Sequence, residues 1–263
     1  MAAAGIGRRL RSQGPKALVR LAGRPLLVHA VEAMEANDCV TAVVVVAHPD
    51  ALGASAKLLA DEGFAKVVAV VAGGPTRQAS VAAGLAAMPP GPAFVAVHDA
   101  ARPLPGRGSV DRLLELLDAA RSGAGAGDPS HRGTPRPTGA PLRDSPDPSG
   151  GSPEPLRPAG VVPGVPVVDT VRRVDDDQRS RGIVDRDQLR AVQTPQLFVR
   201  EALEAAHRKA MLDGVEASDE AALVELAGHP VQVVPGSHEN LKVTTALDLL
   251  VAEALLTRTR RPP

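Results

Sequence analysis

AAAGIGRRLRSQGPK, residues 2–16, is a glycine loop followed by a run of cations. Gly5 and Gly7 have no Cβ, so the backbone can turn tightly there and present its N–H groups to a ligand. No acidic residue precedes Glu32, whereas the same region carries Arg8, Arg9, Arg11, Lys16, Arg20 and Arg24. The formal net charge of the whole chain is +0, so this local excess indicates a polyanionic ligand. A glycine-rich turn beside a solvated basic face is the alternative.

The spacing of the loop excludes the two commonest phosphate-binding loops. A dinucleotide-binding fingerprint needs a third glycine where this chain has Leu10, and a Walker loop needs Gly-Lys-Ser/Thr where it has Gly14-Pro15-Lys16. What remains, G-x-G-x-R followed by Pro-Lys, resembles the signature of nucleotidyltransferases that join a sugar or polyol phosphate to a nucleoside triphosphate.

Strand-like and helix-like segments alternate after this loop. Apolar periodicity predicts helices over residues 25–36, 51–62, 110–120 and 246–256, and strands over 40–47, 66–71, 93–97, 159–162 and 231–234. A loop at 73–80 is expected to run into a further helix that ends at 87. Residues 194–198 are expected to lead into a helix ending near 212, residues 218–220 to open another helix, and residues 240–244 to be extended. This alternation predicts one α/β domain over 1–263 with a doubly wound, mainly parallel sheet.

A glycine loop of this kind needs a preceding strand to orient its amides. Only three alanines stand between Met1 and Gly5. We therefore expect the chain as written to lack its first strand; the alternative is that the alanines themselves form a stunted strand.

Two segments depart from the alternation. Residues 122–158 are rich in proline and glycine and almost free of large apolar residues, which predicts a disordered surface insertion. Residues 165–192 hold two extended segments around a polar turn at 175–181, the pattern of a β-hairpin arm.

Composition excludes several classes of function. The chain has three Phe and neither Tyr nor Trp, so a nucleic-acid platform built on base stacking is not expected. Cys39 is the single cysteine, which rules out an internal disulfide, and the seven histidines include no pair at zinc-ligand spacing. Without an 18-residue apolar run or a signal peptide, the expected location is the cytoplasm, with no membrane partner.

Eight motifs along the chain together carry a family resemblance. In order they are AAAGIGRRL…PKAL, GGPTRQAS, VHDAARP, VVDTVRR, VDRDQL, QTPQLF, SDEA and ENLKVT. This series resembles the 2-C-methyl-D-erythritol 4-phosphate cytidylyltransferase family of non-mevalonate isoprenoid synthesis. The resemblance implies a nucleotide-diphospho-sugar transferase-like fold, a homodimer interlocked by the β-arm, and use of CTP, a polyol phosphate and Mg²⁺ with release of pyrophosphate.

The resemblance also implies the site residues. Arg9, Lys16 and Lys242 would be catalytic contacts to the phosphates. Substrate-binding positions would be Ala3, Ala4, Gly5, Gly7, Gly74, Arg77, Ser80, Asp99, Arg102, Asp169, Thr170, Arg186 and Thr194, with Asp99 also at the metal. Of these, Thr170 and Arg186 would reach the sugar phosphate in the neighbouring subunit. The family usually has an acidic residue where this chain has Pro75, which affects the expected ribose contact.

Other functions fit parts of the pattern. A related enzyme acting on ribitol 5-phosphate, or another sugar-phosphate nucleotidyltransferase, would share the fold. An inactive nucleotide-binding homologue is suggested by the short first strand, although Arg9, Lys16, Asp99 and Lys242 are all present. RNA binding by the basic amino-terminal region lacks aromatic support.

Overall fold

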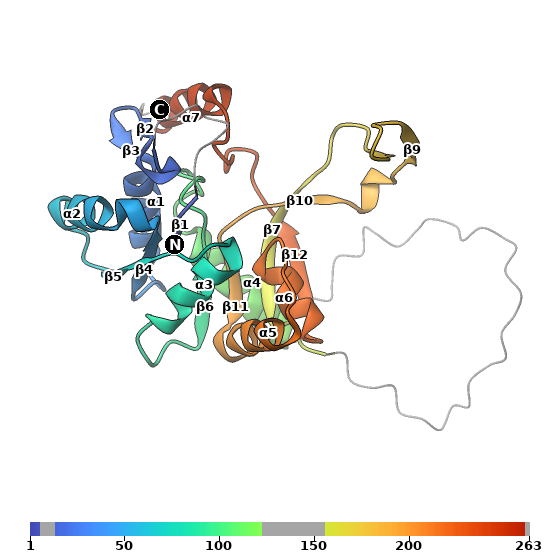
Figure 1. Cartoon of the computed structure of the whole chain (residues 1–263), viewed down its shortest axis with the longest axis horizontal. Coiled ribbons are helices and arrows are strands. Elements are labelled where there is room, and N and C mark those ends of the chain that lie inside the picture. The colour runs from blue at the N-terminus through green and yellow to red at the C-terminus, as the bar shows by residue number, and fades with distance from the viewer. Residues whose placement is uncertain (6–13, 123–155, 261–263) are drawn as a thin grey trace, which may run out of the picture.

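The computed structural model describes residues 1–5, 14–122 and 156–260 (Figure 1). Residues 6–13, 123–155 and 261–263 lie outside the described residues. Most of the predicted insertion at 122–158 therefore lies outside the described residues, and so do Gly7 and Arg9. None of the helices in the described ranges is long and apolar enough to cross a membrane.

The first half of the chain forms a three-stranded parallel sheet. Its strands are β1 (Ala2–Ala3), β4 (Val43–Ala47) and β5 (Val67–Ala72), in the order β1-β4-β5. Its helices are α1 (Leu26–Glu35), α2 (Leu52–Glu62) and α3 (Arg77–Ala86). Between β1 and α1 lie the 3-10 helix η2 (Lys16–Leu18) and a small hairpin of β2 (Arg20–Leu21) and β3 (Arg24–Pro25), and η3 (Pro49–Ala51) precedes α2. All five β4 residues are buried, as a β-branched run between two helical layers requires.

The second half forms a mixed sheet in the order β10-β7-β11-β6, and β12 pairs with β7 as well. The strands are β6 (Phe94–Val97), β7 (Gly160–Pro166), β10 (Arg190–Val192), β11 (Gln196–Val199) and β12 (Val231–Pro235). The helices are α4 (Ser109–Ser122), α5 (Arg200–Asp213), α6 (Glu220–Leu226) and α7 (Ala246–Arg260). β12 runs parallel to β7, whereas β11 is antiparallel to both β6 and β7.

Two segments of this half are described in more detail by the structure than by the sequence. Residues 194–198 lead into the expected helix, α5, which begins at Arg200, but Gln196–Val199 first forms strand β11, which is paired on both sides and was not expected. Residues 240–244 belong to no strand; the amide of Val243 donates to the carbonyl of Ala101 instead. The other predicted helices and strands form within a few residues of their expected ends.

Helices cover both faces of the sheets, as a doubly wound fold requires. Side chains of α1 and α4, among them Leu27 and Leu117, share one buried cluster with Val45 of β4. A second cluster contains side chains of α3, α5 and α6 packed around Phe198 of β11. The predicted fold class is therefore confirmed, with β10 and β11 as antiparallel strands of the second sheet.

Strand β1 joins the two sheets. Ala2 pairs with Val46 of β4 on one side and forms a parallel bridge with Asp99 on the other. The amide of Ala2 donates to the carbonyl of His98 at 2.7 Å, and the amide of Ala100 donates to the carbonyl of Ala2 at 3.0 Å. The expectation that the first strand is missing is therefore wrong, because two of the alanines form a short strand, the alternative that the sequence left open.

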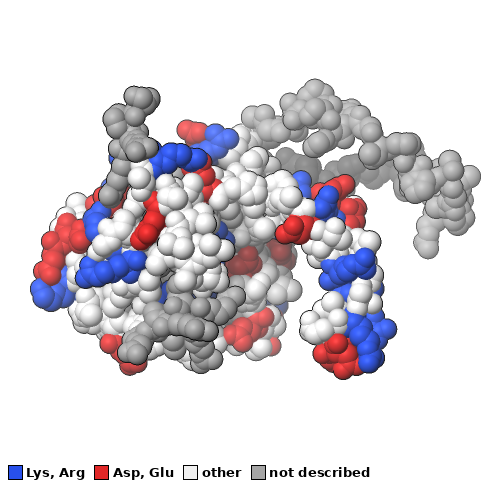
Figure 2. Space-filling view, turned by 90° about the horizontal axis from the view of Figure 1, so that it is seen from above, with Lys and Arg blue, Asp and Glu red and all other residues white. Residues whose placement is uncertain are grey.

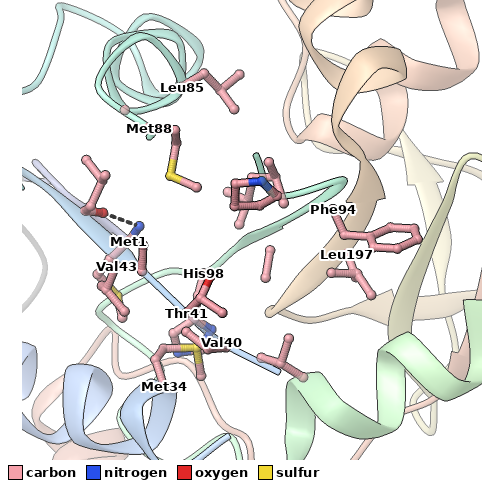
Figure 3. Close-up of a pocket in the computed structure, with 18 of the residues that line it drawn as sticks. Met1, Met34, Val40, Thr41, Val43, Leu85, Met88, Phe94, His98 and Leu197 are labelled. Carbon is pink, nitrogen blue, oxygen red and sulfur yellow. Dashed lines mark hydrogen bonds between the residues drawn. The ribbon is translucent and has the colours of Figure 1, made fainter. Parts of the chain in front are cut away.

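An apolar cavity of about 260 Å³ lies beside Met1, between β4 and β6 (Figure 3). Figure 3 shows Met34, Leu85 and Phe94 around this space, with Met1 at its edge. The amino group of Met1 donates to the carbonyl of Val44 at 2.9 Å, and its burial lowers the pKa of this group to about 6, against the opposing charge of Asp99. A space bordered by two strands and lined by helix side chains has the form of a strand-sized gap in the sheet.

The predicted β-hairpin arm is present. β8 (Arg172–Val174) pairs antiparallel with β9 (Ser180–Ile183), and the 3-10 helix η5 (Arg186–Gln188) follows before β10 returns to the body on β7. The arm stands away from the rest of the molecule, and Figure 2 shows charged side chains of both signs along it. Every residue of β8 and β9 is exposed in the single chain.

Candidate active site

A cavity of about 780 Å³ opens where β1, β4, β5 and β6 end. This edge is where ligands bind in open α/β sheets. The cavity is lined by nine of the residues expected from the sequence: Ala3, Ala4, Gly5, Lys16, Gly74, Arg77, Ser80, Asp99 and Lys242. These residues come from four separate parts of the chain, and the fold brings them together.

The turn between β5 and α3 forms one wall of this cavity. A Cβ on Gly73 would lie 2.6 Å from the Ala4 side chain, and one on Gly74 would lie 2.6 Å from the Ala79 side chain, so both positions require glycine. The Thr76 side chain caps α3 by accepting a hydrogen bond from the Ala79 amide at 3.1 Å. The amino-terminal end of α3, which attracts anions, is thereby held at the cavity.

Ser80 stabilises this same turn. Its hydroxyl donates to the carbonyl of Thr76 at 2.9 Å and accepts a hydrogen bond from the amide of Gly74 at 3.2 Å. The side chain is buried and these partners already occupy its hydroxyl. The described geometry therefore gives Ser80 the role of shaping the cavity wall.

Asp99 is the acidic centre of the cavity. Its side chain is 11% exposed. Oδ2 lies 2.6 Å from Lys242 Nζ, and Oδ1 lies 3.3 Å from Arg77 Nη2. Burial opposes ionisation of this carboxyl group, but the charges of Lys242 and Arg77 outweigh it and lower the pKa of Asp99 to about 2. The carboxylate is therefore ionised throughout the neutral range.

Arg77 is shared between two carboxylates. On its other side, Nη1 donates to both oxygens of Glu220, at 2.8 and 2.7 Å. Glu220 is the first residue of α6 and is 1% exposed. Burial raises the pKa of Glu220, while the Arg77 charge acts in the opposite direction. The sequence analysis missed this partner, because nothing in the local pattern connects two residues 143 positions apart.

Arg102 and Thr194 do not line this cavity, contrary to expectation; they support the loop that carries Asp99. The Thr194 hydroxyl accepts a hydrogen bond from the Asp99 amide and lies 3.0 Å from His98 Nδ1. Arg102 donates from Nη1 to the Asn240 carbonyl at 2.6 Å, which links the Asp99 loop to the segment carrying Lys242. Both residues thus hold the backbone next to Asp99 and Lys242 without lining the cavity themselves.

His98 makes the folded state sensitive to acid. Burial lowers the pKa of His98 to about 4, whereas an unfolded histidine has a pKa of about 6.5. Between pH 6.5 and 4 the unfolded state binds a proton that the folded state does not, so acidification favours unfolding. We expect the free energy of unfolding to fall by up to about 3 kcal/mol across this window through His98 alone.

Denaturant unfolding measured from pH 4 to 7 checks this expectation. His98→Gln should reduce the slope of unfolding free energy against pH, whereas His229→Gln, at an exposed position, should leave it unchanged. Equal slopes in His98→Gln and the unaltered chain would contradict a neutral, buried His98.

The arm residues lie apart from the cavity of their own chain. Asp169, Thr170 and Arg186 are all exposed, and none of them lines the cavity. The Arg186 guanidinium donates to the carbonyl of Val168 within the arm. Gly7 and Arg9 belong to the loop outside the described residues, so their expected contacts stay predictions.

His48 and Pro49 line the cavity and were not singled out from the sequence. Both directly follow β4, so their place at the carboxyl end of a predicted strand was the available signal. Pro75, which replaces the family's usual acidic residue, also lines the cavity. Pro75 has no carboxylate for the ribose contact that the family resemblance implies at this position.

Asp99 is the one acidic residue lining this cavity among the described residues. The described part of the chain contains no group of three or more His, Cys, Asp or Glu side chains that could hold a metal ion. A single carboxylate fits Mg²⁺, because that ion is commonly held by one or two carboxylates together with water and substrate phosphates. One carboxylate is too few ligands for a metal ion that the protein would hold without water or substrate.

The comparisons with known proteins agree with this geometry. The sequence profile of the 2-C-methyl-D-erythritol 4-phosphate cytidylyltransferase family matches residues 1–129 and 155–258. A protein of that name from Streptomyces coelicolor is 41% identical over 266 residues, covering 98% of this chain and 84% of the relative. A crystal structure of the Thermus thermophilus protein of that name has a TM-score of 0.67 at 32% identity, covering 94% of this chain and 95% of that one. The 4-diphosphocytidyl-2C-methyl-D-erythritol synthase from Anaerococcus prevotii has a TM-score of 0.72 at 22% identity, with 98% and 94% covered, and shows the fold alone.

Proposed function

The chain belongs to the 2-C-methyl-D-erythritol 4-phosphate cytidylyltransferase family, and we propose that it transfers the cytidylyl group of CTP to 2-C-methyl-D-erythritol 4-phosphate. The products are 4-diphosphocytidyl-2-C-methyl-D-erythritol and pyrophosphate. The observation that carries the proposal is the cavity itself, which Lys16, Arg77, Asp99 and Lys242 line together with the glycine turns. That combination suits a nucleoside triphosphate, because the cations can contact its phosphates and the carboxylate can contact its sugar.

The reaction explains why cations dominate the site. An oxygen of the substrate phosphate attacks the α-phosphorus of CTP, and the bond from that phosphorus to the β-bridging oxygen breaks as pyrophosphate leaves. The attacking phosphate monoester is already anionic near neutral pH, so no strong general base is required. The barrier arises from bringing two anions together and from charge that develops on the leaving group. Lys16 and Lys242 are placed to offset both.

Magnesium remains part of the proposal. Asp99 would supply one carboxylate oxygen, and when bound the ion would neutralise charge on phosphate oxygens. In the described structure both oxygens of Asp99 contact cations, so Lys242 or Arg77 would have to share the carboxylate with the ion. The chain's own part is to keep Asp99 ionised and fixed at the cavity.

The arm supports a proposal of homodimerisation. Its residues Thr170 and Arg186 are exposed and do not line the cavity of their own chain. The family resemblance nevertheless implies that they contact the sugar phosphate. An arm that crosses to a second copy would satisfy both observations. In such a dimer each active site would combine the cavity of one subunit with the arm of the other.

Arg186→Ala tests the crossing arm. We expect a KM for the polyol phosphate raised about ten- to hundredfold, with the KM for CTP little changed, because one charge-assisted hydrogen bond is lost. Arg179→Ala, at an exposed position nearer the arm tip, is the control and should behave as the unaltered chain.

Mixing experiments then separate the two arrangements. A hybrid of Arg186→Ala and Lys242→Ala subunits regains one complete site only if the arm crosses. Restored activity in mixed dimers supports the crossing arm; absence of rescue in dimers shown to be mixed would assign the arm to its own subunit.

Pyrophosphate release with CTP tests the function and its rivals in a single panel. Turnover with 2-C-methyl-D-erythritol 4-phosphate supports the proposal, and turnover with ribitol 5-phosphate instead would reassign the substrate. CTP binding without turnover on any polyol phosphate would indicate the inactive homologue. Omitting Mg²⁺ in the same assay tests the need for that ion.

A further inference from the structure

A chain of charges that begins at the buried Glu220 connects α6 to the active-site cavity. Glu220 lies behind the wall, Arg77 lies in the wall, and Asp99 and Lys242 face the cavity. The Arg77 guanidinium uses Nη1 for both oxygens of Glu220, and presents Nε and Nη2 to Oδ1 of Asp99 at 3.4 and 3.3 Å. Of the two carboxylates, Glu220 therefore has the shorter and stronger contacts with Arg77.

The unequal distances matter for Asp99. An arginine beside a single carboxylate tends to form a bidentate pair that occupies both of its oxygens. Here Glu220 draws the guanidinium away, so Arg77 approaches only Oδ1, and Oδ2 stays 2.6 Å from Lys242 Nζ. The two acids and two bases in this chain of contacts also cancel in charge, so the cavity gains no additional positive charge from Arg77.

We propose that Glu220 is a positioning residue of the active site, which anchors Arg77 so that Asp99 keeps Oδ2 available to Lys242 and to the reacting groups in the cavity. This inference rests on the proposed transfer reaction. Glu220 does not line the cavity, so it acts through Arg77 and not on the substrates.

Glu220→Gln tests the proposal with little change of shape. The amide oxygen still accepts from Arg77, but the attraction of the negative charge is lost, and Arg77 should move into a bidentate pair with Asp99. We expect kcat to fall about tenfold or more through the misplaced Asp99. The KM for CTP should fall about threefold or more, because one uncompensated positive charge is added near a polyanion.

Opposite consequences for rate and for affinity distinguish positioning from simple loss of structure. Glu225→Gln, on the same helix but exposed, is the matched control and should leave both constants unchanged. If folded Glu220→Gln protein had the kcat and KM of the unaltered chain, or lost activity only in proportion to its folded fraction, the proposal would be overturned.

A double variant guards against failure of Glu220→Gln to fold. Arg77→Gln together with Glu220→Gln replaces the buried ion pair by two neutral amides that can bond to each other. If Glu220 acts through Arg77, the double variant has the same kcat as Arg77→Gln alone. A further fall in kcat on adding Glu220→Gln would show that Glu220 acts by another route.

The unaltered chain, assayed in parallel, separates this proposal from the proposed function. If that chain is inactive with every polyol phosphate, the transfer reaction fails as a function, and direct titration with CTP then tests the charge argument alone. A Kd for CTP tightened by Glu220→Gln supports the placement of Arg77, and an unchanged Kd overturns it.

Discussion

Lys242→Ala is expected to lower kcat by about two to three orders of magnitude, the range found when one preorganised electrostatic contact to a transition state is removed. The ammonium group lies 2.6 Å from Asp99 and faces the cavity from the segment after β12. It stands where the charges of two phosphates must be brought together. Steady-state rates of pyrophosphate release, measured at saturating CTP and polyol phosphate, provide the comparison.

The fold should tolerate this change. The Lys242 side chain is partly exposed, and Asp99 retains Arg77 as a partner. Lys57→Ala is the matched control, because Lys57 is an exposed surface lysine paired with Asp61 on α2. Near-normal kcat in Lys242→Ala, at an unchanged melting temperature, would remove this lysine from the catalytic contacts.

An apolar extension fused upstream of Met1 is expected to stabilise the protein by several kcal/mol. The cavity of about 260 Å³ between β4 and β6 corresponds to about 6 kcal/mol at roughly 24 cal/mol per Å³, if it were filled completely. Half of that value would raise the melting temperature by about 6 to 12 °C in a domain of this size. A peptide bond in place of the amino group would also remove a buried titratable amine, whose pKa burial lowers to about 6, from this apolar site.

The register of the neighbouring strands fixes how the extension should lie. The Met1 amino group donates to the Val44 carbonyl and the Val46 amide donates to the Met1 carbonyl, so the chain already runs parallel to β4 at that point. Five residues of Val, Ile and Ala should continue this pairing. An extension of five Gly and Ser residues is the control for length. Equal melting temperatures for the two fusions would show that the cavity does not accept a strand.

Local patterns predicted the first half of the fold well. β4 is a run of valines and α1 begins just after Pro25, so composition and helix-start signals agreed with the tertiary structure. The strand β11 could not be predicted in this way. It has four residues preceded by Pro195, and its strand conformation depends on pairing with β6 and β7. Such pairing is set by long-range contacts that no local window contains.

The site was predictable in its residue types and less so in their roles. Lys16, Asp99 and Lys242 line one cavity, as the motifs indicated. Thr194 was assigned to substrate, yet its hydroxyl bonds to the Asp99 amide, because a polar side chain in a motif can serve either ligand or backbone. Glu220 is the reverse case. The sequence indicated only that it begins a helix, whereas in the structure its carboxylate accepts hydrogen bonds from Arg77.

The bridge at Ala2 has a consequence for folding cooperativity. Among the described residues, the strand pairing between the two sheets passes through Ala2 alone, while side-chain packing provides the rest of the junction. Each sheet has its own ladder, so the halves are candidates for separate opening units in hydrogen exchange. The cavity takes Gly74 and Arg77 from one half and Asp99 and Lys242 from the other. A nucleotide bound there would act as a clamp across the junction, so that the two units open together as one.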